Sequence, residues 1–183
     1  MVLELVGIAP GVSQRPANIR PRCMARCHAY VLERSEGRIL VEPAVDEDHE
    51  RDEWIKWGKA HPIDAIVITH DHPDHTWRVQ EIAEGLRVPI WGPEKKGSLL
   101  GWQTLDAPGH DDHEIVLWDG RVLVLGDAHN VGTGNPHELI QTIEKLVALN
   151  PEIALPAHGR PLLEHSFAPW TRLRMTDPSQ AYP

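Results

Sequence analysis

The most constraining feature of this sequence is a run of metal-ligand side chains placed directly after a short apolar segment. Residues 65–68 read Ala-Ile-Val-Ile, and residues 70–75 read His-Asp-His-Pro-Asp-His. A short, wholly apolar run is typical of a strand buried on both faces of a sheet. Imidazoles and carboxylates packed at the end of such a strand favour a metal centre over an ordinary surface loop.

The proline inside this run predicts how its ligands divide. In extended chain, residues i and i+2 point to the same side, so His70 and His72 can present two imidazoles to one ion. Pro73 suits the first position of a helix and favours an extended conformation at His72. The change from strand to helix is therefore predicted just after His72. Asp74 and His75 then point in another direction and could serve a second ion, at about 3.5 to 4 Å from the first as in two-metal sites.

Three further ligand-type residues stand beside glycine or proline after predicted strands. His110 ends a Pro-Gly-His turn, Asp127 follows Gly126, and His158 precedes Gly159. The carboxyl ends of strands are where open α/β folds build their sites. Although the chain has 12 histidines, accidental surface residues would not recur in this context. The residues thus predict one metal site assembled from several strand ends.

The order of predicted elements is that of a layered α/β protein without internal repeats. Strands are predicted at residues 3–8, 29–33, 38–42, 65–69, 88–91, 102–107, 115–118, 122–125 and 153–155, and helices at 46–61, 73–86 and 136–149. Asp119-Gly120 is a strong hairpin signal between two of these strands. Asn135 is a good N-cap for the last helix, with Pro136 at its first position.

Length and charge limit the number of domains and the class of partner. A chain of 183 residues, 41% of them hydrophobic, predicts one domain over residues 1–183, with a tail from about residue 170 expected to be flexible. The net charge of -9 disfavours nucleic acid and anionic membranes as partners. No apolar run approaches the roughly 20 residues of a membrane-spanning helix, and Glu4 interrupts the apolar N-terminus, so we expect a cytoplasmic protein.

The two cysteines are predicted to be free thiols. Cys23 and Cys27 lie in a segment that we expect to be extended, which would separate their Cα atoms by about 13 Å, too far for a disulfide. Free thiols fit a reducing compartment. A zinc site of both cysteines and His28 is disfavoured, since it has only three ligands in one short segment. The surrounding basic segment, Arg15 to Arg26, is interpreted as a solvated loop, with an anion-facing rim of the site as the alternative.

In this order the motifs resemble those of the metallo-β-lactamase-fold hydrolases. That family carries H-x-H-x-D-H, a Pro-Gly-His turn, Gly-Asp after a strand and a late His-Gly, and the resemblance covers roughly residues 3 to 165. The branch most resembled includes glyoxalase II-like thioesterases and small hydrolases related to the mitochondrial lactamase-like endoribonuclease. The resemblance implies a four-layered αβ/βα sandwich. It also implies a ligand set in which His70, His72 and His110 hold a first metal ion, Asp74, His75 and His158 a second, and Asp127 bridges both.

The activity implied by the resemblance is dinuclear metal-dependent hydrolysis. Nitrogen and oxygen ligands suit two zinc ions, and iron or manganese is also compatible. A hydroxide bridging the ions would attack a small ester, thioester, lactone or related amide. Asp74 is the candidate catalytic residue, orienting the hydroxide and accepting a proton. The partner would be a small-molecule substrate whose binding residues the sequence does not identify, and a homodimer that shares pocket walls is left open.

Other activities of the same fold are left open as well. Persulfide dioxygenases share the first motif but hold one iron with two histidines and the aspartate, and a phosphodiesterase or ribonuclease is a further alternative. A metal-stabilised binding protein without turnover is a third class. The segment after His165 is short for the helical substrate-binding domain of glyoxalase II, which argues against a glutathione thioester.

Some residues depart from the family or have no assigned role. Glu42 stands where the family usually has aspartate, so the contact normally made there is in doubt. His113, His129 and His137 lie near proposed ligands in the sequence, yet we expect them to contact ligands indirectly or to lie at the surface. His129, two residues after Asp127, is the best candidate among them for a substrate contact.

Overall fold

Two six-stranded sheets, each with its own helices, make up the part of the chain that the computed structural model describes, residues 3–17, 23–130, 132 and 134–163. The chain divides into a first unit, residues 1–95, and a second, residues 96–183. The single domain expected from the sequence stays a prediction. The tail predicted from about residue 170 lies outside the described residues.

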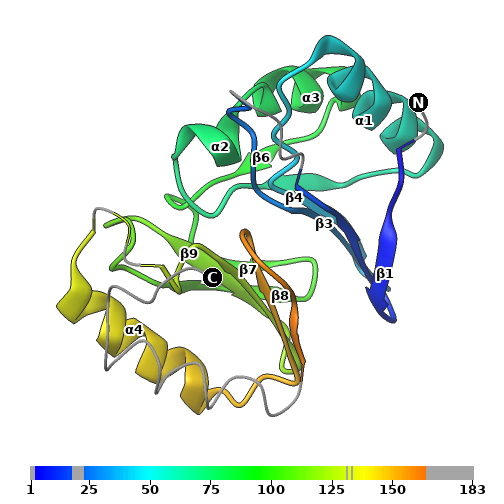
Figure 1. Ribbon diagram of the computed structural model, residues 1–183. Helices are drawn as coiled ribbons and strands as arrows, with labels where there is room; N and C mark the ends of the chain where they lie inside the picture. The colour runs from blue at the N-terminus through cyan, green and yellow to red at the C-terminus, as the bar shows by residue number, and fades with distance from the viewer. Residues whose placement is uncertain (1–2, 18–22, 131, 133, 164–183) are drawn as a thin grey trace. The chain divides into compact units, whose positions relative to one another are not determined.

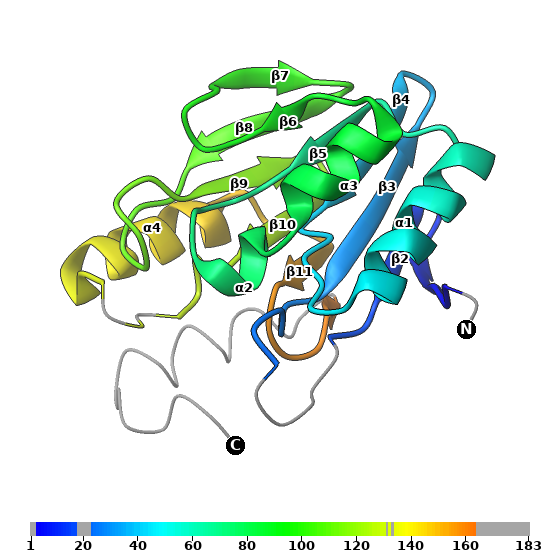
Figure 2. The ribbon, with the colours of Figure 1, turned by 90° about the horizontal axis from the view of Figure 1, so that it is seen from above.

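In the first unit the strands follow one another across the sheet in chain order. They are β1 (Val6–Ala9), β2 (Val12–Arg15), β3 (Ala29–Arg34), β4 (Gly37–Val41), β5 (Ala65–Val67) and β6 (Ile90–Trp91). The first four pair antiparallel, whereas β4, β5 and β6 are parallel and need crossover connections. Helices α1 (Asp48–Ala60) and α3 (Val79–Leu86) supply these crossovers. Both cover the same face of the sheet (Figures 1 and 2).

The core of the first unit lies between this face and the two helices. Alternate residues of the central strands point toward the helices, and all of them are buried. The best-buried members are Leu40, Ile66, Trp54, Ile82 and Val79. Burial of one such side chain stabilises the fold by about 1.5–3 kcal/mol, so the core fixes where β5 ends. The His-rich segment begins at that end.

In the second unit the sheet has the order β12-β11-β10-β9-β8-β7. Its elements are β7 (Gly97–Leu99), β8 (Trp102–Asp106), β9 (Ile115–Trp118), β10 (Val122–Gly126), α4 (Pro136–Ala148), β11 (Ile153–Pro156) and β12 (Leu162–Leu163). Only β10 and β11 are parallel, and α4 is the crossover between them, packed on one face of the sheet (Figure 1). Leu123, Leu125 and Leu146 lie in the core between α4 and the strands.

Two local predictions for the second unit are confirmed, the start of α4 at Pro136 and the hairpin turn between β9 and β10. The Asn135 side chain accepts hydrogen bonds from the backbone N–H groups of His137 (3.0 Å) and Glu138 (3.4 Å), and Pro136 is the first residue of α4. The β9–β10 hairpin turns at Gly120, where φ is +92°. Helix α4 ends at Ala148, and within the described ranges no helix has the length and apolar character needed to span a bilayer.

The prediction of one helix over residues 73–86 is wrong. The segment forms α2 (Pro73–Thr76) and α3, separated at Arg78, whose φ is +62°. Long-range contacts favour the break, because the Trp77 carbonyl accepts a hydrogen bond from Val45 N (3.2 Å) and the Arg78 guanidinium bonds Asp48 of α1. The first strand lies at residues 6–9 rather than 3–8, and β2, β7 and β12 are short strands that the sequence did not predict.

Glu81 of α3 pairs with two arginines, and we expect its contribution to stability to depend on pH. Its carboxylate accepts hydrogen bonds from Arg78 (3.0 Å) and from Arg51 of α1 (2.8 Å), which lower the pKa of Glu81 to about 2. Because folding lowers this pKa, the stabilisation is present above the ordinary value of 4.5 and disappears as the pH falls toward about 2. Glu81→Gln should lower Tm slightly at neutral pH, since exposed ion pairs contribute little.

The control for this prediction is Glu84→Gln, which removes the same charge from α3 but only the contact with Gln80 (3.0 Å). Thermal unfolding of both variants, measured from neutral pH down to the lowest pH at which the wild type stays folded, should separate them. The Tm difference between wild type and Glu81→Gln should narrow below about pH 4.5. Equal Tm values for the two variants at neutral pH would mean that the arginine contacts do not stabilise the fold.

Candidate metal centre

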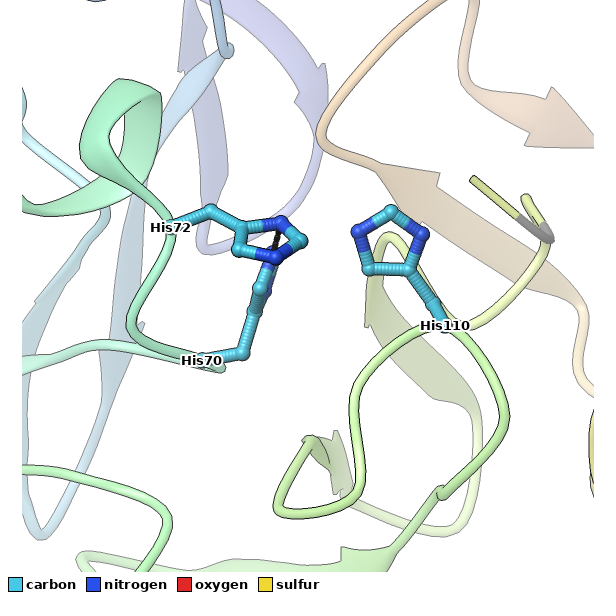
Figure 3. Close-up of side chains that lie close together, drawn as sticks. All are labelled: His70, His72 and His110. Carbon is cyan, nitrogen blue, oxygen red and sulfur yellow. Dashed lines mark hydrogen bonds between the residues drawn. The ribbon is translucent and has the colours of Figure 1, made fainter. Parts of the chain in front are cut away.

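In the first unit, the strand-to-helix change falls where the sequence predicts it. His72 is the extended N-cap of α2 (φ -66°, ψ 146°), and Pro73 is the first helical residue. His70 Nε2 and His72 Nδ1 lie 2.9 Å apart (Figure 3). Two nitrogens on one tetrahedral zinc are separated by about 3.3 Å, given Zn–N distances of about 2.0–2.1 Å. The two imidazoles therefore need only a small adjustment to bind one ion.

Hydrogen bonds fix the tautomer of His70. The Thr69 hydroxyl donates its single hydrogen to Glu42 Oε1, so its oxygen can only accept from His70 Nδ1, which lies 3.1 Å away. In the neutral imidazole, Nε2 then carries a lone pair and faces His72. Thr69, Glu42 and His70 itself are all buried. The arrangement leaves the ring nitrogen on the His72 side available to a metal ion.

Glu42 contacts the proposed ligand His75, although the family usually has aspartate at this position. The residue is fully buried with φ +51°, and its Oε1 lies 2.9 Å from His75 Nδ1. Burial opposes ionisation, but the charge of His75 and hydrogen bonds from His75 and Thr69 outweigh it and hold the pKa of Glu42 below its usual value. The longer side chain and the left-handed backbone together bring the carboxylate to the imidazole. Glu42 therefore orients His75.

When the ring of His75 is neutral with its hydrogen on Nδ1, toward Glu42 Oε1 at 2.9 Å, its Nε2 atom carries a lone pair. Nε2 faces Asp74 Oδ2 at 3.7 Å. Two hydrogen-bond acceptors that face each other repel unless a cation or a proton lies between them. The His75 side chain is fully buried and the Asp74 side chain is 31% exposed, so this pair can take a cation from one open side.

The three predicted ligands of the second unit converge on one carboxylate. Asp127 follows β10, His158 follows β11, and His110 lies in the loop between β8 and β9. Asp127 Oδ2 is 3.5 Å from His110 Nε2 and 3.5 Å from His158 Nε2. Parallel pairing of β10 with β11 continues past the strands, since Ala157 N donates to Gly126 O (2.9 Å). This register brings Asp127 and His158 together.

The ring of His110 is also held in one tautomer. Its Nδ1 lies 2.7 Å from the Asn130 carbonyl oxygen, which can only accept, so Nδ1 carries the hydrogen. In the neutral ring, Nε2 therefore presents a lone pair to Asp127. Gly132 packs against the imidazole, and a Cβ there would lie 2.8 Å from His110 Cε1. The loop after Asp127 thus holds His110 in place.

The structure adds a residue that sequence reasoning missed. Glu114 is 1% exposed, and its Oε1 accepts a hydrogen bond from Asp127 N (2.6 Å). An acidic residue immediately before an apolar strand was the available signal. His129 is buried, whereas His113 and His137 are exposed.

The cysteines have separate partners. Both are free, as predicted, and both are buried, but the segment that holds them is bent at positions 24 and 27 and is not extended as expected. Cys23 donates to Asp46, Cys27 donates to the Asp74 carbonyl (3.0 Å), and His28 accepts from Ala17 N (2.7 Å). These contacts give no support to a zinc site of the three residues.

The basic segment Arg15 to Arg26 is described only in part, because residues 18–22 lie outside the described ranges. The Arg15 guanidinium lies 3.6 Å from Glu50 and stacks over Trp54, with 5.4 Å to the ring centroid. Arg26 donates from Nε to the Cys23 carbonyl (2.5 Å). Both side chains therefore have contacts inside the first unit, and a role for them at a site rim stays a prediction.

Comparisons with known proteins relate this chain to one superfamily. The model of the metallo-beta-lactamase superfamily matches residues 25–104. Among curated proteins, a hydroxyacylglutathione hydrolase of Halorhodospira halophila is 31% identical over 126 residues, which cover 56% of this chain and 47% of that protein. The chain thus spans about half the length of the curated relatives that it matches.

Solved structures extend the likeness to nearly the whole chain. A metallo-beta-lactamase from Pontibacter korlensis has a TM-score of 0.76 and 16% identity, covering 96% of this chain and all of that one (100%). Another, from Pseudomonas aeruginosa in its mono-zinc form, has a TM-score of 0.71 and 17% identity, covering 100% of this chain and 98% of its own. These likenesses confirm the predicted fold class, the α/β sandwich of the metallo-beta-lactamases.

Proposed function

Because the chain belongs to the metallo-beta-lactamase superfamily, we propose that it is a dinuclear metal-dependent hydrolase of a small ester, thioester, lactone or related amide. The observation that carries the proposal is the set of facing acceptors within each unit. His75 Nε2 and Asp74 Oδ2 lie 3.7 Å apart, and His110 Nε2 and Asp127 Oδ2 lie 3.5 Å apart. The other ring nitrogen lies 2.9 Å from Glu42 Oε1 in His75 and 2.7 Å from the Asn130 carbonyl oxygen in His110. With both rings neutral, the two atoms of each pair are acceptors, and a divalent cation between them would attract both.

The ligand assignment follows the family's motif, residue by residue. His70, His72 and His110 would hold the first ion, Asp74, His75 and His158 the second, and Asp127 would bridge them. Both nitrogen and oxygen atoms are in the set, which suits zinc, iron and manganese, and we take zinc as the native metal. The assignment joins residues of both units and stands as a proposal.

Two bound divalent cations would supply a hydroxide near neutral pH and would offset charge that develops on the carbonyl oxygen of the substrate. The residues of the chain would do the rest. Asp74, with its side chain 31% exposed, would orient the attacking oxygen and accept a proton at a carboxylate oxygen. Glu42 and Thr69 would keep His75 and His70 in their ligand tautomers throughout the reaction.

The substrate class is argued from chemistry and from relatives. The relative from Halorhodospira halophila is a hydroxyacylglutathione hydrolase, so a thioester belongs among the candidates. With metal ions bound, such a site would supply a hydroxide that also suits the carbonyl groups of esters, lactones and amides, which adds these classes to the candidates. The net charge of -9 argues against a polyanionic nucleic acid as the substrate.

Metal content combined with a substrate panel tests the proposal. We expect two zinc ions per chain in purified protein and hydrolysis of at least one ester, thioester or lactone. A chelator should remove the activity, and added zinc should restore it. One iron per chain with oxygen consumption would identify an oxygenase instead, and turnover of phosphodiesters alone would identify a phosphodiesterase. Bound metal without turnover of any substrate would leave a binding protein.

A further inference from the structure

Glu114 is a buried carboxylate in the loop that carries a proposed ligand. It is the last residue of the loop between β8 and β9, and it is 1% exposed. Its backbone oxygen accepts a hydrogen bond from Ala107 N (2.9 Å), which closes the loop around His110. Burying a carboxylate is unfavourable unless hydrogen bonds compensate for its lost hydration. The partners of this side chain therefore indicate why an acidic residue stands there.

The Glu114 side chain reaches the second ligand loop. Oε1 accepts the backbone N–H of Asp127 at 2.6 Å, a short hydrogen bond of the kind that charged acceptors form. The contact falls where β10 ends, directly after Gly126, whose φ is +54°. Strand β10 ends at Gly126, and beyond it the backbone N–H of Asp127 is bound by the Glu114 carboxylate. Glu114 therefore adds a side-chain constraint to the backbone of this turn.

The same hydrogen-bonded path continues to His110. The Asp127 carbonyl accepts from Asn130 N (2.8 Å), and the Asn130 carbonyl accepts from His110 Nδ1 (2.7 Å). Glu114 is thus connected to Asp127 directly and to His110 through two further hydrogen bonds. The two side chains end with Oδ2 and Nε2 3.5 Å apart.

We propose that Glu114 is the positioning residue that sets the separation and direction of Asp127 and His110 as metal ligands, an inference that rests on the proposed function. Glu114 itself contacts no metal and no substrate in this role. Its carboxylate fixes the turn that carries Asp127, and its backbone closes the loop that carries His110. Removing such a support from a metal ligand lowers metal affinity by about 10–100-fold.

A matched control separates this role from general stabilisation of the second unit. Asp119 is also a carboxylate that accepts backbone N–H groups, from Arg121 (2.7 Å) and Val122 (2.5 Å), but it lies in the β9–β10 hairpin and not in a ligand loop. Asp119→Ala should lower Tm without changing metal affinity. Glu114→Leu should change both.

The experiment measures zinc affinity by competition with a chromogenic chelator, and the visible absorption of protein loaded with Co²⁺, for wild type, Glu114→Leu, Glu114→Gln and Asp119→Ala. We expect Glu114→Leu to lose about 10–100-fold in zinc affinity and to shift the Co²⁺ spectrum. Glu114→Gln keeps an oxygen acceptor, so it should retain more of the zinc affinity than Glu114→Leu does. It also tests the positioning role of Glu114 if the leucine variant does not fold. Wild-type affinity and spectrum in both Glu114 variants, or an equal loss in Asp119→Ala, would overturn the inference.

These readouts do not depend on turnover. If wild type binds two zinc ions but hydrolyses nothing, the proposed function fails while the comparison of Glu114 variants still decides the positioning role. If wild type binds no metal at all, both are wrong. A loss of hydrolysis confined to the Glu114 variants, with unchanged metal affinity and spectrum, contradicts the positioning role alone.

Discussion

Replacing Asp74 by alanine is expected to abolish hydrolysis in a protein that still folds. The carboxylate faces His75 Nε2 at 3.7 Å, and its side chain is 31% exposed, so the change removes both a proposed ligand and the proposed proton acceptor without opening the core. A positioned acid or base contributes about 10²–10⁴-fold to rate, so kcat should fall by at least about 10²-fold on any substrate that the wild type accepts. Steady-state kinetics with parallel metal analysis measures the effect.

Asp71→Ala is the matched control, because Asp71 is an exposed carboxylate in the same segment and is not a proposed ligand. It should retain wild-type kcat and metal content. An Asp74→Ala protein with full metal content and normal kcat would refute the catalytic role. Equal losses in the two variants would mean that the segment, and not the Asp74 carboxylate, limits the rate.

Replacing Glu42 by leucine is expected to destabilise the protein and to weaken metal binding together. Glu42 is fully buried, accepts from the Thr69 hydroxyl, and lies 2.9 Å from His75 Nδ1. Removing one partner of a buried charged pair costs about 3–5 kcal/mol of unfolding free energy. Loss of the group that orients a histidine ligand lowers metal affinity by about 10–100-fold. Urea unfolding of the metal-free protein and chelator competition measure the two effects separately.

Glu42→Asp serves as the comparison, because it keeps the charge and shortens the side chain by one methylene. Its losses should be smaller than those of the leucine variant in both measurements. A leucine variant with the wild-type urea midpoint and the wild-type zinc affinity would show that the Glu42 contact with His75 has no energetic role.

Features set by neighbouring residues could be predicted from the sequence. Pro73 placed the change from strand to helix at His72, and Asn135 with Pro136 placed the start of α4, because both effects act within a few residues. The sheet positions of the ligands followed from the apolar runs before them. The ligand candidates within each unit could be named because they stand close to the ends of these apolar runs.

Features set by distant residues could not be predicted. The break at Arg78 depends on Val45 and Asp48, more than 25 residues earlier in the chain, so the helical periodicity of residues 73–86 concealed it. The contact of Glu42, which has a positive φ, with His75 of α2 joins residues that are far apart in the sequence, so the residues around Glu42 do not reveal it. Glu114 was missed since its partner, the Asp127 backbone, is 13 positions away.

Because the chain breaks between α2 and α3, different contacts hold the two helices in place. The short helix that carries Asp74 and His75 is fixed by its own contacts, namely Cys27 Sγ to Asp74 O (3.0 Å) and Val45 N to Trp77 O (3.2 Å). Helix α3 is instead oriented by its apolar side chains against the sheet. We therefore expect core substitutions that shift α3 to leave the Asp74 carboxylate and the His75 ring in place.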